Sequence, residues 1–239
     1  MPGSQYIALS GLRARAEQLD RLSSDIANIG TSGYKGERQG RVSAERPAFN
    51  DALQTAIDTT SGATRLDMSN GALAPTGRPL DVALDGPGFF VVKTTAGDRY
   101  TRNGHFTRNS AGQLSTEDGG LVQGDTGPIA LGTGEVKVAE DGTITAGDLP
   151  VGKLKVVTFA DPGRLSLDGT TMLRSDDQPP QAVAAPVVKG GSLEQSNVTV
   201  SSRLAELTTV SRGFEALQKT LSLLMNDVDG KAIEQLGRR

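Results

Sequence analysis

Residues 200–228, VSSRLAELTTVSRGFEALQKTLSLLMNDV, decide how the C-terminal part of this chain folds. Apolar side chains recur in this stretch at alternating intervals of three and four residues, which is the a/d pattern of a coiled-coil seam. A helix with a single apolar stripe is unstable alone, because ordering its backbone costs more free energy than the stripe recovers. The stretch therefore predicts a helix that needs a partner. The seam residues are Leu207, Val210, Phe214, Leu217, Leu221, Leu224 and Val228.

A second amphipathic helix is predicted in the first thirty residues, and it is the obvious partner within the chain. Its apolar stripe has the same three-four spacing, Leu22 and Ile29 widen it, and Gly30 with Gly33 are expected to end it by supplying left-handed backbone angles. The stripe consists of Leu9, Leu12, Ala16, Leu19, Ser23 and Ile26.

Between Leu80 and Phe159 the period changes to that of short strands. Runs rich in β-branched and aromatic residues alternate with glycine, which predicts an all-β domain. Asp141–Gly142 is expected to form a two-residue type I′ hairpin, with further turns at Asn103–Gly104 and Ala111–Gly112. Adjacent residues on a strand face opposite sides, so Phe89 and Phe90 cannot share one face. The runs are DVAL, GFFVVK, RYTR, QLST, LVQG, EVKVAE, TITA and KLKVVTF.

The remaining segments complete an α+β plan in which the two terminal helices pair as a coiled-coil bundle around a central all-β domain. Phe49, Leu53 and Ile57 allow a short helical piece in an otherwise extended linker, and the chain loosens again after Phe159 before a helical pattern starts at Leu193. The expected boundaries are 1–36 for the N-terminal helix, 37–76 for the linker, 77–190 for the β-domain and 191–239 for the C-terminal helix.

Composition excludes several classes of protein. The 25 basic and 28 acidic residues are spread along the chain, so no basic stripe is available for nucleic acid. The sequence contains no apolar run long enough for a membrane span and no pattern of a cleavable secretory signal. It also contains no cysteine, so it forms no disulfide and no thiolate metal site.

No catalytic, metal or cofactor site is predicted. His105 is the one histidine, and a turn or surface role is favoured for it over catalysis. Gly86-Pro-Gly88 precedes a strand instead of a helix, which does not suit phosphate binding. The acidic pairs Glu117–Asp118, Glu140–Asp141 and Asp176–Asp177 adjoin glycine or proline and are interpreted as solvated turn residues.

Periodicity alone leaves two arrangements open. In one, both helices pack against the β-domain of an ordinary α+β monomer. In the other, they form a bundle that neighbouring subunits complete, because a helix pair would leave Leu22, Ile29, Val200 and Leu204 exposed, and such apolar patches mark association sites.

Four separated motifs resemble those of the axial protein family of the bacterial flagellum, which comprises rod and hook proteins. They occur in the family's order and extend from end to end of the chain, and RPLDVAL and the asparagine of YTRNG look more like proximal-rod than distal-rod members. The motifs are SSDIANIGTSGYK at 23–35, RPLDVALDGPGFFVV at 78–92, YTRNGHFTRNSAGQLSTEDGGLVQG at 100–124, and SLEQSNVTV at 192–200 with RGFEALQKT at 212–220.

The resemblance implies a non-enzymatic subunit of the periplasmic basal-body rod, the drive shaft that transmits motor torque. Such a subunit is exported by the flagellar type III apparatus without a cleaved signal, and its partners are copies of itself and other rod proteins. The resemblance also implies that the rod is assembled by the seam residues together with Leu9, Leu12, Leu19 and Ile26 of the N-terminal stripe. It further implies a linker hinge at Asn28, Gly33, Tyr34 and Lys35. The alternatives are a distal-rod member, a secreted multimeric adhesin or binding module, and a carbohydrate-active enzyme. Aromatic residues make up 4% of the chain and tryptophan is absent, which argues against the sugar-stacking sites of the last two.

Overall fold

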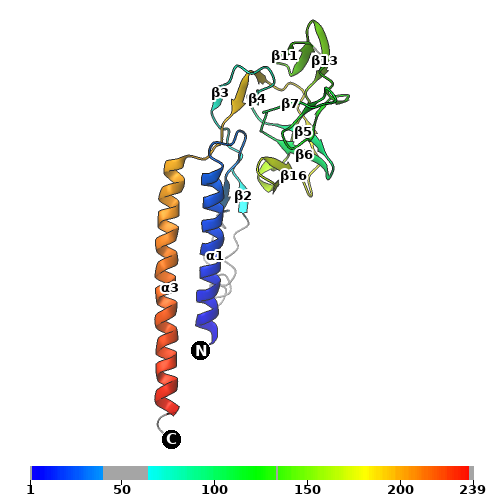
Figure 1. Cartoon of the computed structure of the whole chain (residues 1–239). Helices are drawn as coiled ribbons and strands as arrows, with labels where there is room; N and C mark the ends of the chain where they lie inside the picture. The colour runs from blue at the N-terminus through cyan, green and yellow to red at the C-terminus, as the bar shows by residue number, and fades with distance from the viewer. Residues whose placement is uncertain (1, 40–63, 133, 237–239) are drawn as a thin grey trace. The chain divides into compact units, whose positions relative to one another are not determined.

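The computed structural model describes residues 2–39, 64–132 and 134–236, and it describes side chains within 9–38, 65–132 and 134–222. The expected combination of two terminal helices and a central β-rich region is confirmed (Figure 1). Two compact units can be distinguished. One contains the helices α1 (Pro2–Ala27) and α3 (Val200–Leu236), and the other contains residues 28–38 and 65–199.

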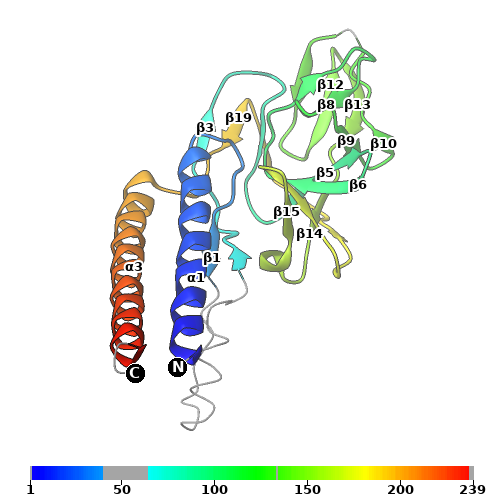
Figure 2. The same cartoon turned by 60° about the horizontal axis from the view of Figure 1, so that its bottom comes forward.

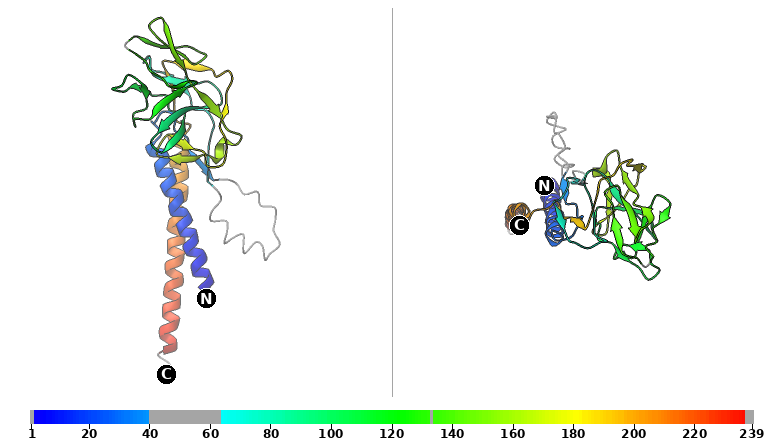
Figure 3. Two further views of the ribbon diagram at one scale, coloured as in Figure 1. Left: turned by 90° about the vertical axis from the view of Figure 1, so that its right-hand side faces the viewer. Right: turned by 90° about the horizontal axis from the view of Figure 1, so that it is seen from above.

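In the helical unit, α1 and α3 lie side by side and run in opposite directions, at a shallow angle (Figures 1 and 3). Asp25 forms an ion pair with Arg203. Arg15 lies ten residues before Asp25 on α1, and Gly213 lies ten residues after Arg203 on α3. A methyl group added at Gly213 would lie 3.9 Å from Nε of Arg15. Four residues further, a methyl group at Gly11 would lie 3.9 Å from Cδ1 of Leu217. The contacts thus advance equally along both helices, which fixes one antiparallel register.

Both helix boundaries next to the β unit differ from those expected. The C-terminal helix begins at Val200 rather than near Leu193, because Ser192–Glu194 forms strand β19. The N-terminal helix ends at Ala27, and residues 28–38 belong to the β unit instead of continuing a helical segment to residue 36. Gly30 and Gly33 do not end the helix as expected, because Gly30 is not among the glycines with positive φ and Gly33, with a φ of 70°, lies six residues beyond Ala27.

The β unit contains one large antiparallel sheet and several small ones (Figures 1 and 2). Its central strand β5 pairs with β6 along one edge and with β9 and β14 along the other. Each of the eight runs predicted from sequence contains a strand. The large sheet comprises β5 (Phe89–Thr94), β6 (Gly97–Thr101), β7 (Thr107–Arg108), β8 (Leu114–Ser115), β9 (Leu121–Gly124), β10 (Gly127–Pro128), β14 (Val156–Thr158), β15 (Ser166–Asp168), β16 (Met172–Arg174) and β17 (Gln181–Ala182).

Two of the small sheets join strands that are distant in sequence. β4 (Val82–Leu84) pairs with β18 (Val188–Gly190), and β3 (Leu73–Pro75) pairs with β19 (Ser192–Glu194). The expectation that the chain loosens after Phe159 is correct only in part: β15 to β19 all follow it, but residues 175–187 contain no strand other than β17. These strands are too short to show periodicity, and their partners stabilise them. The remaining strands are β1 (Glu37–Gln39), β2 (Thr64–Leu66), β11 (Val136–Val138), β12 (Thr143–Ala146) and β13 (Leu149–Lys153), and one 3₁₀ turn spans Pro162–Arg164.

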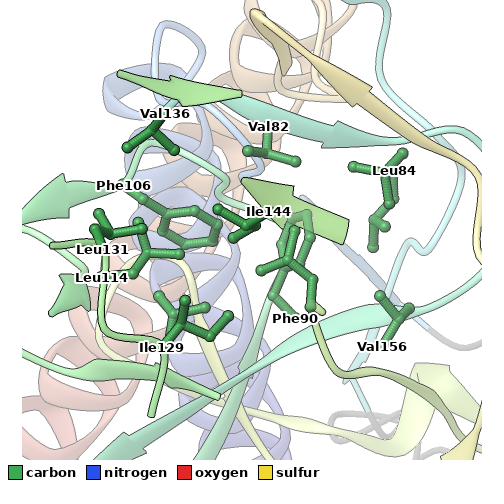
Figure 4. Packing of buried hydrophobic residues seen from close by; sticks show 13 residues of the cluster. Val82, Leu84, Phe90, Phe106, Leu114, Ile129, Leu131, Val136, Ile144 and Val156 are labelled. Carbon is green, nitrogen blue, oxygen red and sulfur yellow. The ribbon is translucent and has the colours of Figure 1, made fainter. Parts of the chain in front are cut away.

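Two hydrophobic clusters cover the two faces of β5. Phe90 packs edge-on against Phe106, with ring centroids 5.2 Å apart, in the larger cluster (Figure 4). Phe89 belongs to the second cluster, where Phe159 lies between it and Tyr100. The prediction that the two phenylalanines face opposite sides is confirmed, and both sides are buried.

The turn at Asp141–Gly142 joins β11 to β12 as expected, but its type differs. Gly142 has a φ of 83°, whereas no other residue type adopts positive φ in the part of the chain that the structure describes. A type I′ turn requires positive φ at both central residues, so this is a longer turn with a left-handed glycine at its end. Asp141 stabilises it by accepting a 3.0 Å hydrogen bond from the Thr143 backbone N–H. The short helical piece proposed around Phe49, Leu53 and Ile57 lies outside the described residues.

Candidate functional site

The seam residues of α3 alternate with exposed neighbours, as one face of a paired helix should. Val210 is buried, and four other seam side chains are half-buried. Thr209, Glu215 and Lys219, which lie between seam positions, are exposed. Leu224 and Val228 lie on the described helix but beyond its described side chains. The half-buried seam positions are Leu207, Phe214, Leu217 and Leu221.

The apolar stripe of α1 is buried less uniformly than the α3 seam. Leu12, Leu19 and Ile26 are half-buried, whereas Leu9 is 59% exposed. The expectation that Leu22 would be exposed is wrong, because it is 3% exposed. Leu22 precedes Asp25 by three residues and so lies on the same helix face, the one that carries the ion pair to α3.

That ion pair joins the two helices near the last turn of α1. Asp25 Oδ2 lies 2.9 Å from Nε of Arg203, and the two side chains are 3% and 15% exposed. Arg203 also pairs with Glu206 one turn along α3. Sequence analysis missed the pair, since Asp25 looks like any polar residue at a helix end until its partner is known.

A second cluster of charges is buried inside the β unit, and we call it the buried anchor: Lys35, Arg102 and Glu194. Lys35 Nζ lies 2.5 Å from Glu194 Oε1, and Arg102 Nη1 lies 3.1 Å from Glu194 Oε2. All three side chains are less than 5% exposed. Removal from water lowers the pKa of Lys35 and that of Arg102, and the Glu194 carboxylate partly offsets both shifts.

Backbone hydrogen bonds connect the anchor to the segments around it. Glu194 accepts from the Gly71 N–H at 2.9 Å through its carboxylate and from the Gly33 N–H at 2.8 Å through its backbone carbonyl. Lys35 donates to the Ser69 carbonyl at 2.7 Å, and Arg102 to the Gly86 carbonyl at 2.6 Å. The anchor thereby fastens the segment that follows α1 to the segment that precedes α3.

The four residues expected to form a linker hinge have different surroundings. Asn28 is the first residue after α1, and its carbonyl accepts a hydrogen bond from the Thr31 N–H at 3.0 Å. Tyr34 and Lys35 lie further along the segment after α1, and each is 3% exposed. Lys35 contacts Ser69 and Glu194, which are more than thirty positions away, so local sequence does not reveal its burial.

His105 has more specific contacts than a simple turn residue. Its Nδ1 lies 2.8 Å from Oδ1 of the buried Asp81, and its Nε2 lies 3.2 Å from Oε1 of the exposed Glu117. Within the described chain, no group of three or more His, Cys, Asp or Glu side chains is placed so that it could hold a metal ion. The other acidic residues singled out from sequence lie at exposed turns, where hydrogen bonds from Thr143 lower the pKa of Asp141 and those from Arg174 and Ser166 lower the pKa of Asp176.

Neither of the described helices has an apolar stretch that could cross a membrane. The family described as "Flagellar hook protein FlgE/F/G D1 domain" matches residues 83–146, a segment that runs from β4 to β12.

Several relatives match almost the whole chain. The flagellar basal-body rod protein FlgF of Caulobacter vibrioides is 31% identical and the alignment covers 100% of this chain and 99% of the relative. FlgF of Escherichia coli is 32% identical over 97% of each chain. The flagellar basal-body rod protein FlgG of Bacillus subtilis is 29% identical over 92% of this chain and 94% of its own. The distal-type alternative is thus no better supported, and the chain belongs to the flagellar basal-body rod protein FlgF family.

Proposed function

We propose that this chain polymerises through its terminal helices, as a structural subunit of the flagellar basal-body rod. Its family membership supports the rod role. The α1–α3 pair would provide the coiled-coil contacts between subunits, and the β unit would add lateral contacts. In this role the protein performs no catalysis, and it transmits torque as part of the periplasmic drive shaft.

The observation that carries the proposal is the set of apolar side chains that the helix pair leaves in solvent. Val200 is 49% exposed and Leu204 is 48% exposed, and because they are four residues apart they share one face of α3. Leu9 is 59% exposed on α1. In the antiparallel register, Leu204 of α3 lies beside the α1 residue that is about fifteen positions after Leu9. Because a helix rises about 1.5 Å per residue, the exposed Leu204 and the exposed Leu9 are about 22 Å apart along the helix axis.

Two separated apolar sites on one helix pair suit contact with further copies of the same chain. A head-to-tail contact, in which Val200 and Leu204 of one copy meet the α1 face around Leu9 of another, would not close on itself and would extend into a helical assembly. The other proposed partners are neighbouring rod proteins, together with the type III export apparatus that delivers the chain without a cleaved signal. Assembly would place the chain in the basal body.

The proposal can be tested with a double variant of the full chain, Leu9→Glu with Leu204→Glu. Both side chains are exposed, so the melting temperature should stay unchanged while assembly and swimming are lost. The matched control is Thr209→Glu with Thr220→Glu, which adds the same charge at two exposed polar positions on a different side of α3 from Val200 and Leu204. Electron microscopy and sedimentation measure assembly, and a complemented deletion strain reports swimming. Normal assembly of the leucine variant would contradict the proposal.

A further inference from the structure

A pocket of about 190 Å³ lies directly beside the buried anchor. Lys35 and Arg102 contribute to its lining, together with the apolar side chains of Met68, Phe89 and Pro162 and the exposed Asn70. All of these residues belong to the β unit. The pocket therefore combines two cations with a largely apolar wall.

The charges at this pocket do not balance. Lys35 and Arg102 share the carboxylate of Glu194, which leaves one positive charge in excess. The next acidic side chain, Asp67, is already paired with Arg38 at 2.7 Å. An uncompensated charge away from water is costly, and the lowered pKa values of Lys35 and Arg102 reflect that cost.

Hydrogen-bond donors are also left over. Both Glu194 oxygens already accept bonds, from Lys35, Gly71 and Arg102. Nε of Arg102 is buried and has no acceptor among the residues that the structure describes. A guanidinium offers five N–H donors in a fixed plane, and a carboxylate matches two of them at once.

We propose that this pocket binds one carboxylate carried on a short aliphatic stem, as on an aspartate or glutamate side chain of a neighbouring protein chain. The carboxylate would neutralise the single excess charge and accept from Arg102, while its stem would lie against Met68, Phe89 and Pro162. A phosphate or sulfate fits less well, because its second negative charge would have no partner and it has no apolar part to place against that wall. The β unit would thus bind one acidic side chain of a neighbouring chain, in addition to the contacts that the helices make.

The test uses the monomeric full chain, so it does not depend on rod assembly and its failure would leave the assembly proposal untouched. Glutamate blocked at both ends (N-acetyl-glutamate amide) is titrated at constant ionic strength, with blocked glutamine as the neutral control. Binding is followed by the NMR signal of the Arg102 Nε–H group and by thermal stability. Blocked glutamate should shift the signal and raise the melting temperature, and blocked glutamine should do neither.

A variant makes the assignment specific to the pocket. Asn70→Asp places a carboxylate at the pocket itself, so it should weaken the response to blocked glutamate at least about fivefold. Asn109→Asp, at a turn away from the pocket, should leave the response unchanged. Three results would overturn the proposal: equal responses to the glutamate and glutamine compounds, an undiminished response in Asn70→Asp, or a response to sulfate and phosphate without one to the carboxylate. If free propionate binds as tightly as blocked glutamate, the occupant is a free carboxylic acid, and the assignment to a protein side chain fails.

Discussion

The ammonium group of Lys35 lies 2.5 Å from the carboxylate of Glu194, although 159 positions separate the two residues in the sequence. Lys35 follows α1 by eight residues, and Glu194 precedes α3 by six. Their contact therefore holds together the two segments through which the chain leaves one helix and reaches the other. In an assembly that bears torque, this buried contact would keep both segments fixed within the β unit.

Glu194→Gln should destabilise the β unit by about 3–5 kcal/mol, because it leaves Lys35 and Arg102 buried without a counter-charge. Chemical denaturation followed by tyrosine fluorescence measures the change. As a control, Asp176→Asn removes a carboxylate that is about half exposed and pairs with Arg174. It should change the free energy of unfolding by about 0.5 kcal/mol or less.

A triple variant separates the net contribution of the buried anchor to stability from the penalty of leaving its charges unpaired. Lys35→Met, Arg102→Met and Glu194→Leu together remove all three charges, and a buried ionic cluster can often be replaced by apolar residues at little cost. The triple variant should therefore be more stable than Glu194→Gln alone. The opposite order would show that the hydrogen bonds of the anchor matter more than its charge balance.

The lowered pKa of Lys35 predicts a specific pH dependence. Burial moves this pKa below the 10.5 of an unburied lysine. Between the two values the unfolded chain binds more protons at this site than the folded chain, so the free energy of unfolding rises with pH there. The stability of the wild-type chain relative to Lys35→Met should therefore increase as the pH is raised toward 10.5. Thermal melts of both proteins at a series of pH values test this, and a falling difference would mean that the Glu194 carboxylate outweighs burial.

The sequence predicted those elements whose pattern lies within one short segment, and it did not predict elements that depend on partners distant in the chain. The strands at DVAL and GFFVVK were predictable, because glycine turns bound apolar runs whose side chains alternate between two buried faces. By contrast, β15 to β19 have two or three residues each and are stabilised by partners that are distant in the sequence, as β18 is by β4. No local pattern marks such strands.

The candidate sites divide in the same way. The helix α3 could be predicted, since the three-four spacing of its apolar residues is a property of one segment. The buried anchor and the Asp25–Arg203 pair could not, because a charged residue in a sequence carries no sign of burial until its partner is known. The burial of Tyr34 and Lys35, which the resemblance had singled out as hinge residues, could not be predicted for the same reason.

Two glycines three positions apart should respond very differently to alanine. Gly33 has a φ of 70°, and a Cβ there would lie 2.3 Å from the backbone nitrogen of Asn103. Gly33→Ala should therefore cost at least about 2 kcal/mol, through both backbone strain and displacement of a neighbouring strand end. A Cβ at Gly30 would have no atom within 4 Å, so Gly30→Ala should be nearly neutral. Denaturation midpoints compare the two, and equal effects would contradict the described path of the chain after α1.

The Asp25–Arg203 pair predicts energetic coupling between the two helices. Asp25→Ala and Arg203→Ala, alone and together, form a double-mutant cycle on the unfolding of the helical unit. Their coupling energy should reach about 0.5–3 kcal/mol, since the two side chains are largely buried. The exposed pair Arg13–Glu17 within α1 serves as the control, and its coupling should be about 0.5 kcal/mol or less. Absence of coupling for Asp25 and Arg203 would argue against this helix register.

The most decisive prediction concerns Leu217 and Leu221, two successive seam positions of α3. Both are half-buried, and Leu217 faces Gly11 of α1. Replacing both with Asp places two carboxylates in an apolar contact, and burying even one unpaired charge costs several kcal/mol. The helices should separate and assembly should fail.

The matched control is Gln218→Asp with Ser222→Asp, which has the same spacing and the same added charge at two exposed positions of α3. Far-UV circular dichroism should show a loss of helix in the seam variant and none in the control, while the melting transition of the β unit stays the same in both. Because the β unit has hydrophobic clusters of its own, a seam variant that unfolds it would show that α3 belongs to a single-chain core. A seam variant that still forms filaments and supports swimming would instead show that the subunits assemble through other surfaces, and the heptad pattern would then serve only the pairing of α1 with α3.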